Sequence, residues 1–494
     1  MRTPIADAKT RRRWAVGLLL LSVALWIPAS DILELVARRD DVLLGRYSVE
    51  RFLMLALSTP LLWVAAYATW RVPIRELRRW GLRVAAVLLA ALSGVIIVEL
   101  TGRLIRAPRY REQDISKPSQ WLSPELAARV RLRQPRRVYE FEFDDLPPTA
   151  RSYPVVRPGF PTIVGSITTD QRGLRNPTER PRTDILTVGD SFTEGYAIPD
   201  GQEWPARLAR AQGRSVYNLG VSGTHLGNYL AVLSEIGMAL QPRIVIVMVY
   251  EGNDFRSLAR HSAHSARAQA SLAAVRRLIK ASPVVLATKR ALIHVLGPLG
   301  ANTSFRGQEL LAWMPVGIPS QTAGPYYSFR PRDLLRFAID EEAFRGSPAW
   351  QTSAEVLREL LRLTRSRGTR LIVVLAPSKV HVLLPRLLER ISPDQLHAFA
   401  TLRDDDLPPA DELVRILRSG AEARAKVLRG FCQREGIELV SLTEPLRRRL
   451  EDGQQVYFTY DQHWTPLAHA LVAEQLHRYL EAHPEVIVEA SRPL

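Results

Sequence analysis

The stretch "DILTVGDSFTEGYAI", residues 184–198, decides the fold of this chain. An apolar, strand-forming run ends there in Gly189, Asp190 and Ser191, and a helix-like pattern follows. A strand that ends in glycine and a small hydroxyl residue presents that hydroxyl at the carboxyl edge of a parallel sheet, where open α/β folds bind ligands. Ser191 is therefore a candidate nucleophile, provided that other segments supply a base and an oxyanion site.

Four more apolar runs follow the first one along the chain. They lie at residues 215–220, 243–250, 370–377 and 437–442. Amphipathic stretches such as 203–212, 354–368 and 421–436 separate them and carry apolar residues three and four positions apart. Alternating strands and helices predict a parallel sheet with right-handed crossovers. We therefore expect a five-stranded, flavodoxin-like α/β sandwich whose carboxyl edge carries the chemistry.

The length of 494 residues predicts two or more domains. The α/β pattern assigns one domain to residues 183–485, with a helical insertion at about 256–349 that either packs on the domain or leans as a lid on lipid headgroups. Residues 106–182 are rich in proline and arginine. They predict an irregular connector that packs on the next domain.

Three apolar stretches near the N-terminus predict a membrane anchor at residues 1–105. They cover about 14–30, 52–70 and 84–100, close to the roughly 17 to 25 residues of a spanning helix. A basic run, residues 11–13, precedes the first stretch as in a signal peptide, but no small-x-small cleavage site follows and two more stretches come after it. Basic residues before the first span and between the second and third favour a multi-pass protein of the inner membrane with its later domain extracytoplasmic.

Charge and cysteine content narrow the class of partner. The net charge of +17 fits a nucleic acid or an anionic membrane surface. The sequence has neither a zinc-ligand spacing nor a basic region joined to heptads, so we expect no nucleic-acid partner. The single cysteine, Cys432, rules out an intrachain disulfide framework and disfavours a cysteine-based metal site. Its helical surroundings predict a buried structural thiol.

The ends of the other predicted strands carry the remaining parts of a reactive site. Gly223 follows the second strand, where the missing Cβ lets its backbone N–H approach a substrate oxygen. Asn253 follows the third strand and offers an amide donor. Asp461 and His463 precede a helix that has Pro466 near its first turn. A histidine oriented by a carboxylate is the usual base for a serine hydroxyl, so these residues predict an acyl-transfer site that needs no metal and no organic cofactor.

In this order, the blocks "GDSFTEG", "NLGVSG", "EGND" and "DQH" resemble those of the SGNH or GDSL hydrolase family, named for an invariant Ser, Gly, Asn and His. The resemblance covers about residues 184–480. It implies a catalytic set and its supporting residues: Ser191 as nucleophile, His463 as base, Asp461 as its partner, Ser191, Gly223 and Asn253 as the oxyanion hole, and Asp190 and Asp254 as supports.

One spacing departs from the family pattern. The last block of the family usually places its aspartate three residues before the histidine, whereas Asp461 and His463 are two residues apart. Membrane-linked relatives that acetylate or deacetylate envelope polysaccharides, including the alginate acetylation proteins, have a comparable Asp-x-His-Trp element. That similarity implies a function in the cell envelope.

For five other residues a functional role is conceivable, but the sequence favours a structural or solvent-exposed role or leaves the two open. His225 and His381 follow strands but have no carboxylate beside them in sequence, so we expect them in loops. Lys379 either meets an anionic glycan or, as we favour, is solvated. Trp204 and Trp464 either stack on sugar rings or close the core.

The sequence therefore predicts a membrane-anchored serine esterase that removes O-acetyl groups from an extracytoplasmic glycan. An O-acetyltransferase would use the same residues with a sugar hydroxyl as acceptor, fed by a membrane acyltransferase partner docked on the three spans. A non-catalytic glycan-binding module is the third hypothesis. It predicts a missing catalytic residue, and the sequence lacks none of them.

Overall fold

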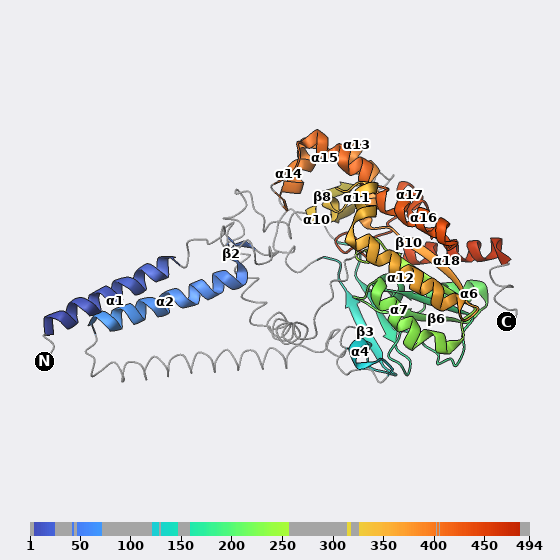
Figure 1. Ribbon diagram of the computed structural model, residues 1–494, viewed down its shortest axis with the longest axis horizontal. Coiled ribbons are helices and arrows are strands. Elements are labelled where there is room, and N and C mark those ends of the chain that lie inside the picture. Colours follow the sequence, from blue (N-terminus) through green and yellow to red (C-terminus); the bar gives the residue numbers. More distant parts are fainter. Residues whose placement is uncertain are drawn as a thin grey trace. The chain divides into compact units, whose positions relative to one another are not determined.

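The computed structural model describes residues 4–24, 42–43, 47–71, 121–127, 130–146, 159–255, 314–317, 326–401, 403–404 and 406–484. The chain divides into two compact units (Figure 1). The first comprises Met1–Ala107, Ser152–Pro154 and His261–Ala312. The second comprises Pro108–Arg151, Val155–Arg260 and Trp313–Leu494.

A five-stranded sheet forms the centre of the second unit, and its strands lie in the order β11-β10-β7-β5-β6. Every neighbouring pair is parallel. In chain order this is the 2-1-3-4-5 arrangement of flavodoxin-like sheets, so the predicted fold is confirmed. The strands match the five predicted apolar runs: β5 (Ile185–Gly189), β6 (Val216–Gly220), β7 (Ile244–Tyr250), β10 (Arg370–Ala376) and β11 (Glu438–Ser441).

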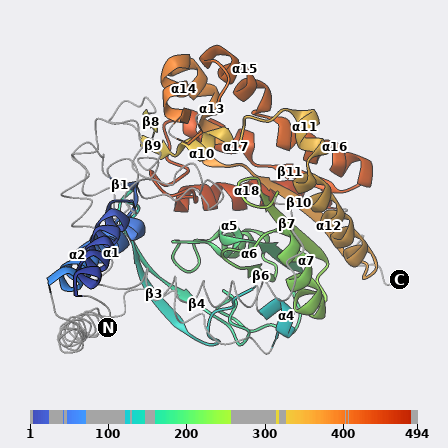
Figure 2. The same ribbon diagram turned by 60° about the vertical axis from the view of Figure 1, so that its left-hand side comes forward.

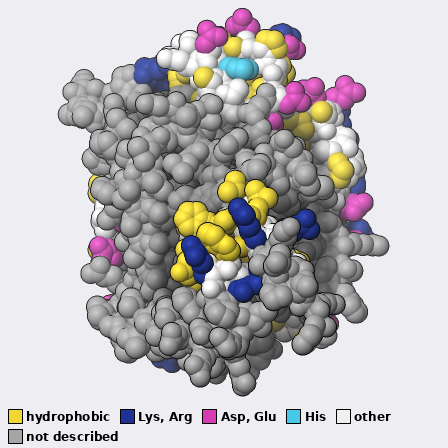
Figure 3. Space-filling model, turned by 90° about the vertical axis from the view of Figure 1, so that its left-hand side faces the viewer, with side chains coloured by type: hydrophobic (Ala, Val, Ile, Leu, Met, Phe, Trp, Pro, Cys, Tyr) yellow, Lys and Arg dark blue, Asp and Glu magenta, His cyan; other side chains and the backbone are white. Residues whose placement is uncertain are grey.

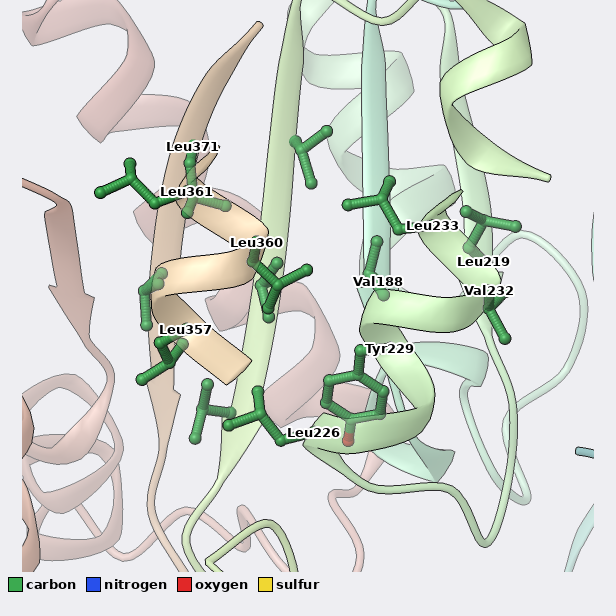
Figure 4. Packing of buried hydrophobic residues seen from close by; sticks show 14 of the residues in the cluster. Val188, Leu219, Leu226, Tyr229, Val232, Leu233, Leu357, Leu360, Leu361 and Leu371 are labelled. Atoms are coloured by element: carbon green, nitrogen blue, oxygen red, sulfur yellow. The ribbon is translucent and has the colours of Figure 1, made fainter. Parts of the chain in front are cut away.

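Helices cover both faces of the sheet (Figure 2). Helices α7 (Leu226–Glu235), α12 (Pro348–Arg365) and α16 (Ala423–Glu435) lie on one face, and α6 (Trp204–Gln212) and α18 (Pro466–Ala482) lie on the other. Every residue of β7 is buried, which explains its continuous apolar run. Figure 4 shows α7 and α12 packing leucine, valine and tyrosine side chains against the sheet.

Shorter elements complete the second unit. The residues predicted as a connector, 106–182, contain an antiparallel pair, β3 with β4, and the described end of the predicted insertion contains another pair, β8 with β9. Most of that insertion, residues 256–313, lies outside the described residues. The shorter elements are α4 (Pro124–Ala127), β3 (Val138–Phe143), β4 (Ile163–Thr168), α5 (Ser191–Glu194), η3 (Gly237–Leu240), β8 (Met314–Gly317), β9 (Tyr326–Phe329), α10 (Pro331–Leu335), α11 (Glu341–Gly346), α13 (Lys379–Arg390), α14 (Pro393–Thr401), α15 (Ala410–Gly420) and α17 (Thr443–Glu451).

In the first unit, α1 (Pro4–Ala24) packs along α2 (Val49–Arg71), which follows a short pair formed by β1 (Val42–Leu43) and β2 (Tyr47–Ser48). The two helices run antiparallel, because Arg11 Nε donates to the Thr69 carbonyl at 2.8 Å and Trp63 Nε1 donates to Ser22 Oγ at 3.1 Å. Figure 3 shows hydrophobic side chains beside basic ones in the described part of one face. The hairpin therefore leaves apolar surface exposed.

The prediction of transmembrane helices is not confirmed. Among the described residues, no helix combines the length and the hydropathy that crossing a bilayer requires. Helix α2 coincides with the predicted span at 52–70, but α1 begins at Pro4, takes in the basic run that precedes the first predicted span, and ends at Ala24. The predicted third span, 84–100, lies outside the described residues.

Candidate active site

The candidate site lies at the carboxyl edge of the sheet, where the strand order reverses between β5 and β7. Open α/β sheets bind ligands at such a switch point. Ser191 is the first residue of α5 and follows the end of β5 by two positions. Asp190 caps this short helix by accepting a hydrogen bond from the Phe192 N–H at 2.9 Å, and Gly195 ends it in the left-handed conformation with φ 87°. The first sequence block therefore forms a capped strand–turn–helix with Ser191 at the start of the helix.

His463 lies between Ser191 and Asp461. Its Nε2 is 2.7 Å from Ser191 Oγ, and its Nδ1 is 2.6 Å from Asp461 Oδ1. The same aspartate oxygen accepts the backbone N–H of His463 at 2.8 Å, so a tight turn brings the two side chains together despite the short spacing. Thr465 is the N-cap of α18, because its side chain accepts a hydrogen bond from the Ala468 N–H. Asp461 is therefore not the capping residue of this helix.

The surroundings of His463 favour its charged form. Burial alone would lower the pKa of the imidazole, but the Asp461 carboxylate, through its charge and its hydrogen bond, raises the pKa of His463 above its ordinary value. Burial opposes the ionised form of Asp461 as well, yet His463 holds the pKa of that carboxyl below its usual range. The side chain of His463 remains 20 % exposed, so part of the base is open to solvent.

Two aromatic rings flank the imidazole. The Tyr196 ring centroid lies 4.4 Å from that of His463, and the Phe192 centroid lies 4.8 Å from it, with both rings tilted by 32° to 34° relative to the imidazole. Aromatic faces attract a cation, so this packing favours the imidazolium that forms when His463 takes a proton. The sequence offered no signal for Tyr196, because its role depends on a residue 267 positions later in the chain.

The two predicted oxyanion donors beyond Ser191 follow the strands on either side of β5. Gly223 has a φ of +79°, a left-handed value that favours glycine, and a Cβ placed there would meet no atom within 4 Å. Its backbone therefore borders open space. Asn253 Nδ2 donates to Asp190 Oδ2 at 2.8 Å. An amide nitrogen carries two hydrogens, so this bond orients the side chain and leaves the second hydrogen for a substrate oxygen.

The predicted supporting carboxylates lie beneath these donors. Asp190 and Asp254 are buried, with exposed fractions of 0 % and 2 %. Burial raises the pKa of both groups, and the charge of Asp190 raises that of Asp254 further. Asp254 accepts the Tyr229 hydroxyl at 2.8 Å and the Tyr250 N–H at 2.7 Å, which ties the third block to α7 and β7. Asp190 therefore holds the Asn253 side chain, and Asp254 holds the backbone at the end of β7.

Glu194 braces the loop that carries Gly223. Its carboxylate accepts the Ser222 N–H at 2.8 Å and the Ser222 hydroxyl, and it pairs with Arg133 at 2.8 Å. Arg175 donates to the carbonyls of Glu194 and Gly195 at 3.1 and 2.6 Å. Both arginines belong to the segment predicted as a mere connector, so that segment contributes directly to the architecture of the site.

Two of the sequence-based interpretations need correction. Lys379 is fully buried instead of solvated, with 0 % exposed. His381 lies in α13 rather than in a loop, between Glu251 and Glu422 at 2.9 and 3.1 Å. Although burial opposes its charge, these carboxylates raise the pKa of His381 to about 9.

His225 lies in the loop before α7, as expected, and is the N-cap residue of that helix. Trp204 and Trp464, for which two interpretations stood open, are both fully buried in the core. Over the described ranges, no group of three or more His, Cys, Asp and Glu side chains is arranged to hold a metal ion.

Replacing Asn253 by alanine should lower the turnover number by about 10²- to 10³-fold with little change in KM, because an oxyanion donor acts mainly in the transition state. The substitution also removes a hydrogen bond from the buried Asp190 carboxylate, so the melting temperature should fall. Steady-state kinetics on p-nitrophenyl acetate, with thermal unfolding in parallel, checks both effects. A rise in KM alone would assign Asn253 to substrate binding.

Comparison with known proteins places a family match over part of this domain. Residues 187–326 match the model of the GDSL-like Lipase/Acylhydrolase family. No match is found among curated proteins.

Solved structures show only distant similarity. A member of the lipolytic protein G-D-S-L family from Veillonella parvula is 11 % identical, with 60 % of this chain and 97 % of that chain covered and a TM-score of 0.29. An α/β hydrolase enzyme from the metagenome of Lake Arreo, Spain, is 15 % identical, with 62 % and 98 % covered and a TM-score of 0.29. An acetyl xylan esterase is 9 % identical, with 60 % and 98 % covered and a TM-score of 0.27. The family match therefore makes residues 187–326, which contain the end of β5 and all of β6 and β7, similar to the GDSL-like Lipase/Acylhydrolase family.

Proposed function

We propose that this protein is a serine esterase that removes O-acetyl groups from an extracytoplasmic glycan. The observation that carries the proposal is the series of hydrogen bonds from Asp461 through His463 to Ser191, with lengths of 2.6 and 2.7 Å. A nucleophile in contact with a base, and a base oriented by a third group, is the arrangement that activates a serine hydroxyl. The resemblance of the Asp-x-His-Trp element to that of envelope polysaccharide acetylation proteins supports the glycan as substrate.

In the proposed mechanism, Ser191 Oγ attacks the ester carbonyl carbon while His463 Nε2 takes its proton. The backbone N–H groups of Ser191 and Gly223 and the amide of Asn253 stabilise the oxyanion. The imidazolium then gives its proton to the sugar oxygen as the C–O bond breaks, which leaves an acyl-Ser191. Water, deprotonated by His463, attacks this intermediate and releases acetate, and Ser191 recovers its proton.

The final acceptor separates the esterase from an O-acetyltransferase. Both share the acyl-Ser191, and a transferase hands it to a sugar hydroxyl, with a membrane acyltransferase as the source of acetyl groups. The full-length protein is incubated with acetylated xylan and unacetylated xylopentaose, and free acetate and acetylated pentaose are measured together. We expect acetate release that depends on Ser191. Predominant transfer to the pentaose would favour the transferase, and glycan binding without either product would favour a non-catalytic module.

We also propose that the α1–α2 hairpin binds the lipid bilayer of the inner membrane, with the second unit outside the cytoplasm. Large apolar side chains on both helices support this proposal, because a helical pair in water buries such groups. The exposed fractions are 68 % for Trp14, 64 % for Leu20 and 57 % for Trp63. Arg11 and Arg71 lie at the same end of the antiparallel pair, as basic residues do on the cytoplasmic side of a membrane.

A cysteine at the exposed position Ser419 should reveal the compartment of the second unit. The parent chain is the control: Cys432 is buried, and burial raises the pKa of its thiol to about 12, so it is unreactive. Ser419→Cys should react with a membrane-impermeant thiol reagent in cells whose outer layer alone is permeabilised. Labelling only after lysis of the inner membrane would place the domain in the cytoplasm.

A further inference from the structure

The turn that carries Asp461 and His463 is held by two buried charges outside it. This dyad loop, residues 458–463, closes on itself through a hydrogen bond from the Phe458 N–H to the His463 carbonyl at 3.0 Å. Its remaining backbone groups need partners, because unpaired buried N–H and C=O groups are costly. Lys379 binds carbonyls of the loop, and Asp145 binds its amides.

Lys379 binds the loop from the start of α13. Its Nζ donates to the carbonyls of Ser328, Phe458 and Thr459 at 2.8, 3.1 and 2.9 Å, which uses all three ammonium protons. The side chain is 0 % exposed. Burying an ammonium group is expensive unless it is fully hydrogen-bonded, so the three carbonyls have to stay where they are for the charge to be tolerated.

Asp145 binds the same loop from the segment after β3. Its carboxylate accepts the N–H groups of Thr459, Tyr460 and Asp461 at 2.7, 3.1 and 2.8 Å, and that of Phe160 at 2.9 Å. The residue is 4 % exposed. Hydrogen bonds from N–H groups to an ionised carboxylate are about twice as strong as neutral ones, so this contact fixes the three residues that lead into His463.

We propose that Asp145 and Lys379 form a charged clamp that positions the Asp461–His463 pair for proton transfer to Ser191. Neither residue touches His463 or Ser191, so both are positioning residues, and this role rests on the proposed serine esterase function. The clamp explains how a spacing of two residues suffices. With its backbone amides held by Asp145, the loop is bent so that one oxygen of Asp461 meets both the N–H and the Nδ1 of His463.

The clamp predicts a loss of activity at alkaline pH. Burial lowers the pKa of Lys379 to about 8, although the carboxylates of Asp145, Asp461 and Asp333 favour its charge and Arg330 opposes it. A neutral amine has two hydrogens for three carbonyls, so the loop loses one contact above that pH. The pKa of Lys379 is lower in the folded protein than in the unfolded chain, so the unfolded chain binds more protons between about pH 8 and the ordinary lysine pKa. The free energy of unfolding therefore rises with pH over this range. Activity should therefore fall without unfolding.

Lys379→Met and Asp145→Asn test the clamp in the full-length protein with p-nitrophenyl acetate as substrate. We expect each variant to lower the turnover number by about 10²-fold, the cost of a misplacement of about 1 Å, with little change in KM. Lys379→Met should also lack the alkaline decline near pH 8. The control is Asp184→Asn, which alters another aspartate that accepts a backbone N–H, at the opposite end of β5, and should leave the turnover number unchanged.

Either of two results would overturn the clamp: a folded Asp145→Asn or Lys379→Met with the parent turnover number, or an alkaline decline shared by the parent and Lys379→Met. If Lys379→Met fails to fold, the turnover number of Asp145→Asn and the pH profile of the parent test the clamp instead. A parent turnover number in Asp145→Asn, or a parent without a decline near pH 8, would then overturn it. The Ser191→Ala variant is run beside them. Hydrolysis that does not depend on Ser191 would refute the esterase itself, whereas Ser191-dependent hydrolysis unaffected by Asp145→Asn would refute only the clamp.

Discussion

Ser191→Ala should reduce hydrolysis of p-nitrophenyl acetate on the order of 10⁴-fold or more, because no other group of the site supplies the oxygen that forms the acyl-enzyme. Ser191 Oγ is 2.7 Å from His463 Nε2, and losing the hydroxyl leaves that base without a proton to accept. The side chain contributes little to the core, so the melting temperature should stay within a few degrees. Initial rates and thermal unfolding, measured on the same preparation, check both statements.

The matched control for this variant is Ser353→Ala. Ser353 is a buried serine in α12 whose hydroxyl donates to the Ala349 carbonyl at 2.7 Å, remote in sequence from all four blocks. Its replacement should leave the rate unchanged. A folded Ser191→Ala protein that retained the parent rate would show that the reaction does not pass through this serine, and the esterase proposal would then fail.

Asp461→Asn should lower the turnover number by up to about 10⁴-fold, because an amide donates where the carboxylate accepted and imposes the wrong tautomer on His463. The pH profile should change too. His463 acts as a base only when neutral, and its pKa is raised in the parent despite burial, chiefly by Asp461. Removing the negative charge lowers that pKa, so the acid limb of the activity profile should move to lower pH while the plateau falls.

Asp340→Asn is the control for the second variant. Asp340 caps α11 by accepting the Ala343 N–H at 2.8 Å, and asparagine caps a helix about as well as aspartate. Neither its rate nor its stability should change. If Asp461→Asn likewise kept the parent rate, His463 would be an unassisted base and the contact at 2.6 Å would have no part in catalysis.

Local patterns were enough to predict the sheet and the place of the site. Strand and helix periodicities are properties of neighbouring residues, so β5, β6, β7, β10 and β11 could all be located from apolar runs and the helices between them. Right-handed crossovers then restrict the possible orders of these strands to a few. Since the carboxyl ends of parallel strands meet at one edge, the blocks after β5, β6 and β7 had to converge there.

The N-terminal segment shows where hydropathy alone was insufficient. Apolar runs predicted three spans, but the helices begin and end where hydrogen bonds and packing dictate, and the described α1 includes the basic run Arg11, Arg12 and Arg13. A hydropathy pattern locates apolar residues without locating helix ends, which are the least certain part of any prediction from sequence.

The support of the site was decided by tertiary structure alone. Lys379 followed a strand and was expected in solvent, yet it is buried because carbonyls at positions 328, 458 and 459 surround its ammonium group. The sequence did not reveal the contacts of Asp145 and Glu194 either. Asp145 binds Asp461, 316 positions away, and Glu194 binds Arg133, 61 positions away. Sequence determined the strands, the order of the blocks and the reactive residue types, because these depend on local periodicity and side-chain chemistry. Only the folded chain decided which buried charges meet, because burial and hydrogen bonding join residues whose separation in sequence carries no periodic signal.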